Sequence, residues 1–349
     1  MPTLISDACD MEYRSNLRFA IIGCGSAGKK RSAALPRGAL RIACDSKLNR
    51  AAEIASQHNG CKPTVSNDDT IRDPNIDTVI ICTPHALLAE LALKAVKAGK
   101  HILVEKPGAI TSASLKEIQA ISTKTGSLVR VGFNHRYHPV FQKAYQLVRD
   151  EKLGQPMFVR ARYGHGGRID FEKEWRAHPR LSGGGNLLDM GIHLIDLAGS
   201  FLGEFVSAEG QLFTYFWKMP VEDNAFLHLR TADNRSAWLH SSYTEWKNLF
   251  SFEIYFRQAK LQIDGIGRSY GTGRLSYHRM LPQMGPPDTV VFDFPEEDPT
   301  WSQELAEFEQ DISLGRTPSP GLTEAIKALE VVEEIYRKDR SVASFQSAS

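Results

Sequence analysis

The sequence lacks a surplus of either charge. Its 42 lysine and arginine residues face 41 aspartate and glutamate residues, so the formal net charge is +1. A nucleic-acid-binding protein usually carries a basic excess, and this balance therefore argues against a nucleic-acid partner. No apolar run approaches the ~20 residues that span a bilayer, and residues 1–18 hold no apolar core of a signal peptide. We expect no membrane partner and a flexible extension over residues 1–16.

Cysteine is scarce and irregularly spaced. The five cysteines all lie in the first quarter of the chain, and none forms a C-x-x-C pair. An odd, unpatterned set favours reduced thiols in a cytoplasmic protein over a disulfide framework. Internal repeats and low-complexity segments are also missing. At 349 residues the chain is too long for one typical core, so we expect two domains, 17–132 and 133–349.

Strand and helix signals alternate over residues 17–132. This alternation predicts an α/β domain with a doubly wound parallel sheet of the Rossmann type. In such a sheet, ligands bind at the carboxyl ends of the strands. The expected strands are 17–22, 40–44, 78–82, 101–104 and 128–132, and the expected helices are 26–35, 47–58, 86–98 and 112–124.

A glycine-rich turn follows the first expected strand. Its sequence, Gly23-Cys24-Gly25-Ser26-Ala27-Gly28, is a G-x-G-x-x-G that runs into a helical pattern. Gly23 permits the tight turn, Gly25 lets the backbone approach a pyrophosphate, and Gly28 allows close packing of helix and strand. Because the motif alone is weak, this strand–turn–helix context carries the prediction of a dinucleotide site over a plain structural turn.

Asp45 follows the second expected strand. A carboxylate there accepts both hydroxyls of an adenosine ribose and repels a 2′-phosphate. We therefore expect NAD as the cofactor. Lys47 and Arg50 lie close behind and leave NADP open.

Two further strand ends carry polar side chains. The apolar run 102–104 leads into Glu105-Lys106-Pro107, where proline cannot continue the strand. Lys106 is thus a charged group at the edge where ligands bind, although by itself it would be interpreted as a solvated lysine before a turn. The run 79–82 ends in the same way, in Thr83-Pro84-His85.

Beyond residue 133 the pattern changes to strands without intervening helices. We predict an α+β domain with a large, mostly antiparallel open sheet. Its expected strands are 156–163, 206–217, 224–231, 235–243, 250–257, 259–264 and 289–293, and its helices are 140–151, 186–201, 301–314 and 323–338. A sheet with one bare face needs a cover, so we expect a homodimer or homotetramer through this sheet.

The helix expected at 186–201 carries a second group of polar side chains. It follows Gly183-Gly184-Gly185, and its Asp189 and His193 are spaced i, i+4, with Asp196 on the same side. A carboxylate one turn from an imidazole sets its tautomer and raises its basicity, as a general base requires. An isolated Asp-x-x-x-His would be interpreted as structural. Together with the dinucleotide fold and Lys106, it favours catalysis.

These motifs, in this order, resemble the glucose–fructose oxidoreductase, inositol dehydrogenase and MocA (Gfo/Idh/MocA) family, from Leu17 to about Arg340. The resemblance implies that Lys106, Asp189 and His193 are catalytic and that copies pair through the second sheet. His85 stands where the family often has asparagine. The cofactor-binding candidates are Gly23, Gly25, Ser26, Ala27, Gly28, Asp45, Thr83, Pro84, His85, Glu105 and Lys106.

The substrate-binding candidates lie beside these motifs. They are Arg136, His165, Arg168, Trp175, Asp189 and His193. We expect no metal site, because His135, His138 and His165 lack the spacing of zinc ligands. Residues 158–180 hold six basic and three acidic side chains, which suggests capture of an anionic sugar such as a nucleotide-linked hexose. The alternative is that these arginines face solvent or a partner subunit.

The sequence thus predicts an NAD-dependent oxidoreductase that transfers hydride between nicotinamide and a hydroxyl-bearing carbon of a sugar or sugar nucleotide. In this hypothesis His193 takes the hydroxyl proton, Asp189 orients it, and Lys106 stabilises charge on the same oxygen. Two alternatives stay open. One is an NAD-requiring glycosidase with no net redox change, which His165-Gly166-Gly167 keeps open. The other is a non-catalytic NAD-bound regulator, against which the presence of Lys106 and His193 argues.

Overall fold

The computed structural model describes residues 16–295 and 297–339 and divides them into two compact units. The first unit comprises residues up to 134 together with 301–326, and the second comprises 135–300 together with the residues from 327 onward. The extension expected over residues 1–16 lies, except for its last residue, outside the described residues. Residues 301–326 join the first unit, not the C-terminal domain of the sequence-based division, because Leu305 and Phe308 are buried in its core.

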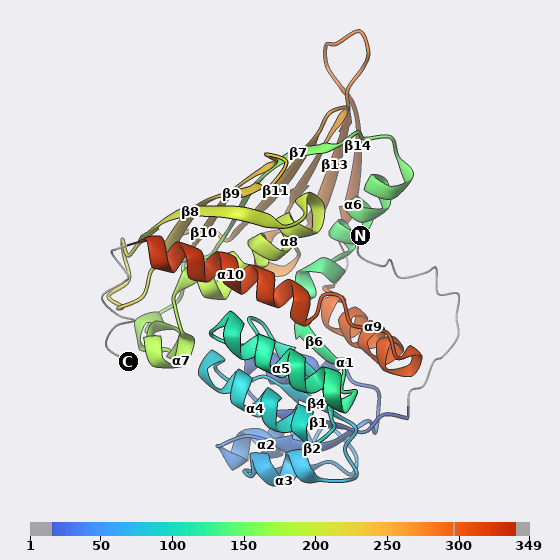
Figure 1. Ribbon diagram of the computed structural model, residues 1–349, viewed down its shortest axis with the longest axis vertical. Helices are drawn as coiled ribbons and strands as arrows, with labels where there is room; N and C mark the ends of the chain where they lie inside the picture. The colour runs from blue at the N-terminus through green and yellow to red at the C-terminus, as the bar shows by residue number, and fades with distance from the viewer. Residues whose placement is uncertain (1–15, 296, 340–349) are drawn as a thin grey trace. The chain divides into compact units, whose positions relative to one another are not determined.

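The first unit is a Rossmann domain (Figure 1). Within its described residues, six parallel strands take the order β3-β2-β1-β4-β5-β6. The strands are β1 (Phe19–Ile22), β2 (Leu40–Cys44), β3 (Lys62–Thr64), β4 (Thr78–Ile81), β5 (His101–Glu105) and β6 (Val129–Gly132). The helices are α1 (Ser26–Ala34), α2 (Leu48–Ala55), α3 (Asn67–Arg72), α4 (His85–Lys97), α5 (Ser112–Thr125) and α9 (Thr300–Leu314).

The predicted doubly wound parallel sheet is therefore confirmed. Every residue of β1 and β4 is buried, which explains why both read as continuous apolar runs and do not alternate. The sequence did not predict β3, a short Lys-Pro-Thr strand with little apolar character, or α3, whose polar residues depend on an N-cap at Ser66. The strand order reverses at β1, so the loops after β1, β4 and β5 share the carboxyl edge where such sheets bind ligands.

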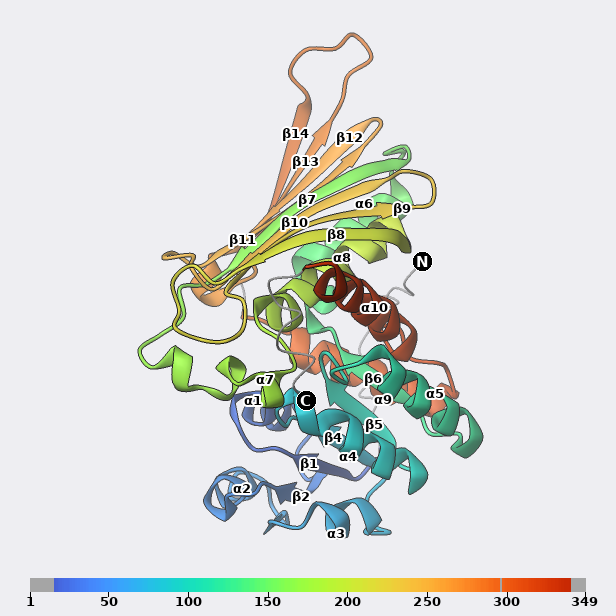
Figure 2. The same ribbon diagram turned by 60° about the vertical axis from the view of Figure 1, so that its left-hand side comes forward.

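The second unit is built on a larger sheet (Figure 2). Its described residues form eight strands in the order β14-β13-β12-β11-β7-β10-β9-β8, antiparallel except for the parallel β7–β10 pair. The strands are β7 (Pro156–Gly164), β8 (Phe205–Phe213), β9 (Asn224–Thr231), β10 (Ser236–Ser242), β11 (Leu249–Phe256), β12 (Ala259–Asp264), β13 (Gly273–Arg279) and β14 (Asp288–Phe294). The mostly antiparallel sheet is confirmed, and β13, with charged residues at both ends, is the strand that sequence analysis missed.

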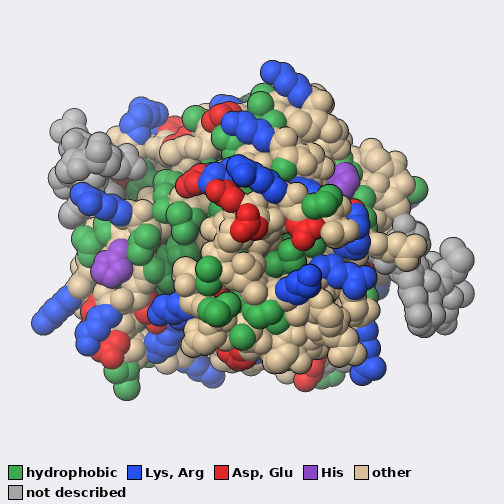
Figure 3. Space-filling model, turned by 90° about the horizontal axis from the view of Figure 1, so that it is seen from below, with side chains coloured by type: hydrophobic (Ala, Val, Ile, Leu, Met, Phe, Trp, Pro, Cys, Tyr) green, Lys and Arg blue, Asp and Glu red, His purple; other side chains and the backbone are tan. Residues whose placement is uncertain are grey.

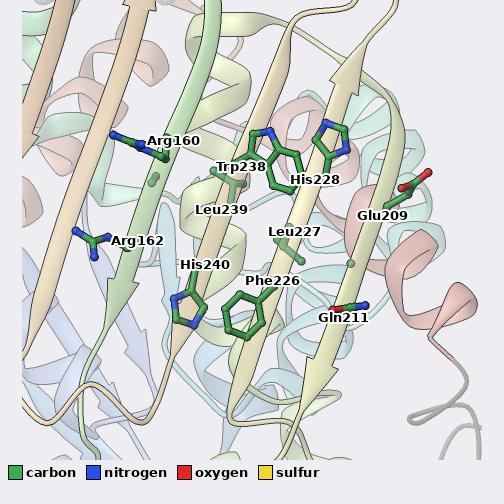
Figure 4. Close-up of a pocket in the computed structure, with 12 residues that line it drawn as sticks. Arg160, Arg162, Glu209, Gln211, Phe226, Leu227, His228, Trp238, Leu239 and His240 are labelled. Atoms are coloured by element: carbon green, nitrogen blue, oxygen red, sulfur yellow. The ribbon is translucent and has the colours of Figure 1, made fainter.

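Helices cover one face of this sheet. They are α6 (Pro139–Asp150), α8 (Ile192–Leu202), preceded by the π-helical turn η4 (Leu187–Gly191), and α10 (Leu322–Lys338). The short helix α7 (Pro179–Ser182) packs instead against the helical turn of residues 175–177. The helix α6 packs against β12, β13 and β14, while η4 and α8 pack against β7 and β10. The helix α10 is tied to β8, where the ammonium of Lys338 donates to the carbonyl of Ala208. The opposite face, which we call the outer face, carries the pocket of Figure 4.

Charges of both signs are mixed on one face of the molecule. On the face seen in Figure 3, basic side chains lie among acidic and hydrophobic ones and do not gather into one large field, as the net charge leads one to expect. Among the helices of the described residues, none combines the length and the hydropathy that crossing a bilayer requires.

Candidate active site

The glycine-rich turn after β1 is shaped by close backbone contacts. Gly23 has φ +97°, and a Cβ there would lie 2.6 Å from the carbonyl carbon of Cys82. A Cβ on Gly28 would lie 2.0 Å from the carbonyl oxygen of Gly23. Gly25 caps α1, and a Cβ there would meet no described atom within 4 Å. The turn therefore excludes side chains where it packs and leaves the N-terminus of α1 accessible, as an anion site requires.

Asp45 is held against this turn. It is buried directly after β2, where the backbone N–H of Cys24 donates to its Oδ2 and that of Lys47 to its Oδ1, both at 2.8 Å. These two hydrogen bonds fix the carboxylate next to the glycine-rich turn. A carboxylate so fixed still has lone pairs for ribose hydroxyls, because each oxygen accepts more than one hydrogen bond.

The loops after β4 and β5 complete this edge of the first unit. Thr83 and Pro84 lead into α4, whose first residue is the buried His85. The hydroxyl of Thr83 is buried and has no hydrogen-bond partner among the described residues. Glu105 ends β5, and Lys106, half-buried, begins the turn that follows.

Glu105 belongs to a buried ion cluster. Arg31 of α1 is almost fully buried; its Nη2 lies 2.7 Å from Glu105 Oε1, and its Nη1 lies 2.6 Å from Oε2 of Glu304 in α9. Burial alone would lower the pKa of Arg31, but the two carboxylates outweigh it and raise the pKa. The cluster ties α1, which begins at the glycine-rich turn, to the end of the strand that precedes Lys106.

These features fit a dinucleotide. The accessible helix N-terminus suits a pyrophosphate, the fixed Asp45 suits a ribose, and the unpartnered Thr83 hydroxyl lies at the adjoining strand end. A metal ion has no comparable site in the described part of the chain. Residues 16–295 and 297–339 contain no group of three or more His, Cys, Asp or Glu side chains that could bind one.

In the second unit, Asp189 lies in η4 and is almost fully buried. Its Oδ2 accepts hydrogen bonds from the hydroxyl of Tyr243 at 2.8 Å and from Nε of Arg176 at 3.0 Å. Burial raises the pKa of Tyr243, and the charge of Asp189 raises it further, so the hydroxyl stays a donor. Burial would lower the pKa of Arg176, but Asp189 outweighs it and raises that pKa. Asp189 is therefore held by one hydroxyl and one guanidinium.

His193 lies near the start of α8 and is buried. Its ring stacks on that of His135 with centroids 4.1 Å apart and an interplanar angle of 18°. His135 Nε2 in turn lies 3.2 Å from the hydroxyl of Tyr163 in β7. Like charges on two stacked imidazoles repel, so this contact favours at least one neutral ring.

The candidate helix differs from the expected one at its start. Residues 187–191 form a π-helical turn, whose wider winding changes the spacing on which the i, i+4 argument relied. Asp196, three residues after His193 in the regular helix α8, forms a bidentate ion pair with Arg136, at 2.8 and 2.6 Å. Arg136, a substrate-binding candidate, is thus buried and bound to α8.

The remaining substrate candidates lie after β7. His165 contacts the ring of Tyr243 with centroids 5.1 Å apart, and burial lowers the pKa of His165. Trp175 lies under the Arg176 guanidinium, 4.5 Å from it. Arg168 is exposed and forms an ion pair with Glu174 at 2.6 Å. The structure therefore brings His165 and Trp175 to the group around Asp189 and leaves Arg168 at the surface.

The basic residues of segment 158–180 do not form one wall. Arg160 and Arg162 alternate with the buried Val159 and Ala161, so they lie on the outer face, opposite η4 and α8. Arg160 and Arg162 therefore do not face the group around Asp189, and for these two the alternative that the arginines of this segment face outward holds. Arg176 is the arginine of this segment that contacts Asp189.

Sequence analysis did not select Arg176, Tyr243 or His135 as site residues. Arg176 was visible only as one of six basic residues, and Tyr243 as the last residue of an expected strand. Both gain their place through tertiary contacts with Asp189.

Comparison with known proteins identifies the family. Residues 17–133 match the family model described as an oxidoreductase family with an NAD-binding Rossmann fold, and residues 141–262 match the GFO/IDH/MocA C-terminal domain. The chain belongs to the Gfo/Idh/MocA oxidoreductase family, as its motifs had suggested.

Individual curated relatives share about 30% sequence identity with this chain, over part of its length. The chain is 30% identical to levoglucosan dehydrogenase of Pseudarthrobacter phenanthrenivorans over 220 residues, 59% of this chain and 56% of that protein. It is 30% identical to scyllo-inositol 2-dehydrogenase (NAD(+)) of Bacillus subtilis over 211 residues, 57% and 58% of the two chains. The chain thus spans little more than half the length of these curated relatives. A solved structure of levoglucosan dehydrogenase with NADH and levoglucosan shares the fold, with a TM-score of 0.82 at 23% identity, over 94% of this chain and 97% of that one.

Proposed function

We propose that this chain is an NAD-dependent dehydrogenase that oxidises a hydroxyl-bearing carbon of a neutral sugar or polyol, and reduces the ketone in reverse. The observation that carries the proposal is the buried Asp189, which accepts hydrogen bonds from Tyr243 and Arg176. It lies in the turn that leads into the helix of His193. Support also comes from the fixed Asp45 and from Lys106 at the carboxyl edge of the Rossmann sheet.

Each residue has a defined task in this proposal. His193 takes the proton of the substrate hydroxyl through a ring nitrogen, and the Lys106 ammonium donates a hydrogen bond to the same oxygen as negative charge develops. Asp189 accepts a hydrogen bond from a substrate hydroxyl and orients the sugar. Bound NAD supplies the hydride acceptor. In the reverse direction His193 returns the proton to the oxygen.

NAD is the proposed cofactor. The backbone of the glycine-rich turn and the N-terminus of α1 would hold its pyrophosphate, and Asp45 its adenosine ribose. The Asp45 carboxylate is anchored by two backbone N–H groups and cannot easily move away. A 2′-phosphate would meet its charge at close range, so we propose NAD over NADP.

The proposed substrate is neutral. The sequence suggested an anionic sugar, but two of the guanidiniums that motivated this already pair with carboxylates: Arg160 with Glu253, and Arg168 with Glu174. Arg176 is already compensated by Asp189. A carboxylate held this way still accepts hydrogen bonds from substrate hydroxyls, and the ion pair has no net charge to attract a phosphate. The names of levoglucosan dehydrogenase and scyllo-inositol 2-dehydrogenase, both relatives, also point to uncharged substrates.

The test follows NADH absorbance after the protein is mixed with NAD and a panel of neutral sugars, polyols and sugar nucleotides. We expect NADH in stoichiometric amounts with a neutral sugar or polyol, and loss of that signal in His193→Asn. Glu334→Gln, which removes a partly exposed carboxylate of α10 that pairs with Lys338, is the control. Substrate turnover without NADH would instead indicate a glycosidase, and bound NAD without any turnover would indicate a regulator. Preference for a sugar nucleotide would contradict the neutral substrate.

We also propose that a second copy covers the outer face of the large sheet. This face holds a pocket of about 540 Å³ in which Trp238 and His228, and Phe226 and His240, form stacked pairs beside the arginines of β7 (Figure 4). Trp238 is 57% exposed in the single chain, and large exposed aromatic groups favour association. Sedimentation should give a dimer or tetramer that Trp238→Glu weakens. A monomeric wild type at micromolar concentration would contradict this proposal.

A further inference from the structure

A buried carboxylate outside the proposed catalytic residues organises the turn that carries them. Glu222 directly precedes Asp223 and strand β9, and it is 2% exposed. Its Oε1 accepts hydrogen bonds from the backbone N–H of Leu187 at 3.0 Å and from the hydroxyl of Tyr336 at 2.8 Å. The N–H of Gly185 lies 3.1 Å from both carboxylate oxygens.

The backbone of Glu222 adds one more contact. Its carbonyl accepts a hydrogen bond from the N–H of Asn186 at 2.9 Å. Three successive backbone N–H groups, those of residues 185–187, therefore all donate to one residue. These are the groups at the start of a helix that lack an intrahelical acceptor. Glu222 thus caps η4 from a distant part of the chain and brings negative charge to the helix start.

Two of the three glycines before η4 are explained by the same packing. A Cβ on Gly184 would lie 2.1 Å from the hydroxyl oxygen of Tyr336, and one on Gly185 would lie 2.2 Å from the carbonyl oxygen of Glu222. Neither position accepts a side chain without displacing Glu222 or Tyr336. The glycines allow the backbone to approach the carboxylate closely enough for its N–H groups to reach it.

The carboxylate is isolated from water. Burial raises the pKa of Glu222 to about 7, against the hydrogen bonds from Tyr336 and the backbone, which lower it. The titratable groups that face it are Tyr336 of α10 and Tyr243 after β10, and its charge raises the pKa of both. Protonation would turn one acceptor oxygen into a donor that points at N–H groups. The cap is therefore complete in the ionised form and weakened in the protonated form.

We propose that Glu222 is the positioning residue of the catalytic turn, fixing the backbone of residues 185–187 and, through it, Asp189 in η4 and His193 in α8. The proposal rests on the function proposed above for Asp189 and His193. Glu222 touches neither substrate nor cofactor in it. The order of this turn therefore depends on the ionisation of Glu222. Catalysis depends, in addition, on the ionisation of the base His193.

The test compares Glu222→Gln and Tyr336→Phe with wild type and with Glu334→Gln, the same substitution at a partly exposed glutamate of α10 that does not contact residues 185–187. Glutamine keeps an oxygen for Leu187 and Tyr336 but places an NH₂ opposite the N–H of Gly185. One measurement is backbone hydrogen exchange in peptides spanning residues 184–193. The other is kcat and KM between pH 5.5 and 9, together with NAD binding by fluorescence.

We expect Glu222→Gln to exchange at least about tenfold faster in this segment and to lose about tenfold in kcat, which corresponds to one charge-assisted hydrogen bond. NAD affinity should stay within about twofold, because the proposed cofactor residues lie in the other compact unit. The fall of kcat toward acid pH should reflect two ionisations in wild type, those of His193 and Glu222, and only that of His193 in Glu222→Gln. Tyr336→Phe should shift exchange and kcat in the same direction by less, and it keeps the proposal testable if Glu222→Gln does not fold.

A folded Glu222→Gln with wild-type exchange at 184–193 would overturn the proposal, and so would an unchanged pH profile of kcat. Failure of the proposed function is distinguishable, because it would show as an active His193→Asn or an inactive wild type. The exchange measurement needs no turnover and still decides whether Glu222 orders the turn.

Discussion

Replacing Glu222 by glutamine should change how the stability of the protein depends on pH. In the folded chain the pKa of this carboxyl rises from its usual value of 4.5 to about 7. Below pH 4.5 the group is protonated in both the folded and the unfolded chain and contributes no pH dependence. Between pH 4.5 and 7 the unfolded chain gives up this proton while the folded chain keeps it. The wild type therefore loses stability as pH rises through this window, and the loss is complete above it.

The size of this loss follows from the two pKa values. One pH unit between them corresponds to about 1.4 kcal/mol, so the full window amounts to about 3 kcal/mol. Glutamine does not titrate and avoids the loss. The free energy of unfolding of Glu222→Gln, relative to wild type, should thus rise by about 3 kcal/mol from pH 4.5 to 8. Other titrating groups cancel in the difference, since they are common to both proteins.

Urea unfolding followed by tryptophan fluorescence at several pH values measures this difference. Trp175, Trp217, Trp238 and Trp246 lie in the unit that holds Glu222, while Trp301 lies in the other, so the signal reports mainly on the relevant unit. Glu334→Gln should run parallel to wild type. If Glu222→Gln also runs parallel, Glu222 ionises in the folded chain as it does in water, and a pKa raised by burial is wrong for this carboxyl.

Three substitutions test the proposed chemistry. Lys106→Met should lower kcat by ~10²–10³, as for loss of one charge-stabilising donor, and a folded variant with most of its activity would remove Lys106 from the mechanism. His193→Asn should lower kcat by ~10²–10⁴ and flatten the acid limb of oxidation, and activity that survives with its acid limb intact would assign the base elsewhere. Asp45→Ser should narrow the preference for NAD over NADP about tenfold in kcat/KM, and a wild type that already prefers NADP would refute this use of Asp45.

Much of the first unit could be predicted from local sequence. The apolar runs of β1 and β4, the strand–turn–helix context of Gly23–Gly28 and the proline after Lys106 each have a local physical cause, and the strand ends share one edge because parallel strands share direction. Short polar elements such as β3 and α3 carried too little signal, since their stability comes from their neighbours.

In the second unit the sequence determined that a glycine break precedes a helix with Asp189 and His193. Only the tertiary structure decided the environment of that helix. The hydrogen bonds of Tyr243 and Arg176 to Asp189, the stacking of His135 on His193 and the cap by Glu222 join residues 13 to 58 positions apart. Periodicity cannot encode such contacts, because it reports which face of an element is buried and not which side chain it meets there.

The arginines of residues 158–180 show the same division. The alternation of β7 predicted that Arg160 and Arg162 share one face of the sheet. Whether that face lies toward the catalytic turn or away from it depended on the side of the sheet against which α8 packs. Local sequence sets the pattern of a strand, and the burial of apolar surface against other elements sets its orientation.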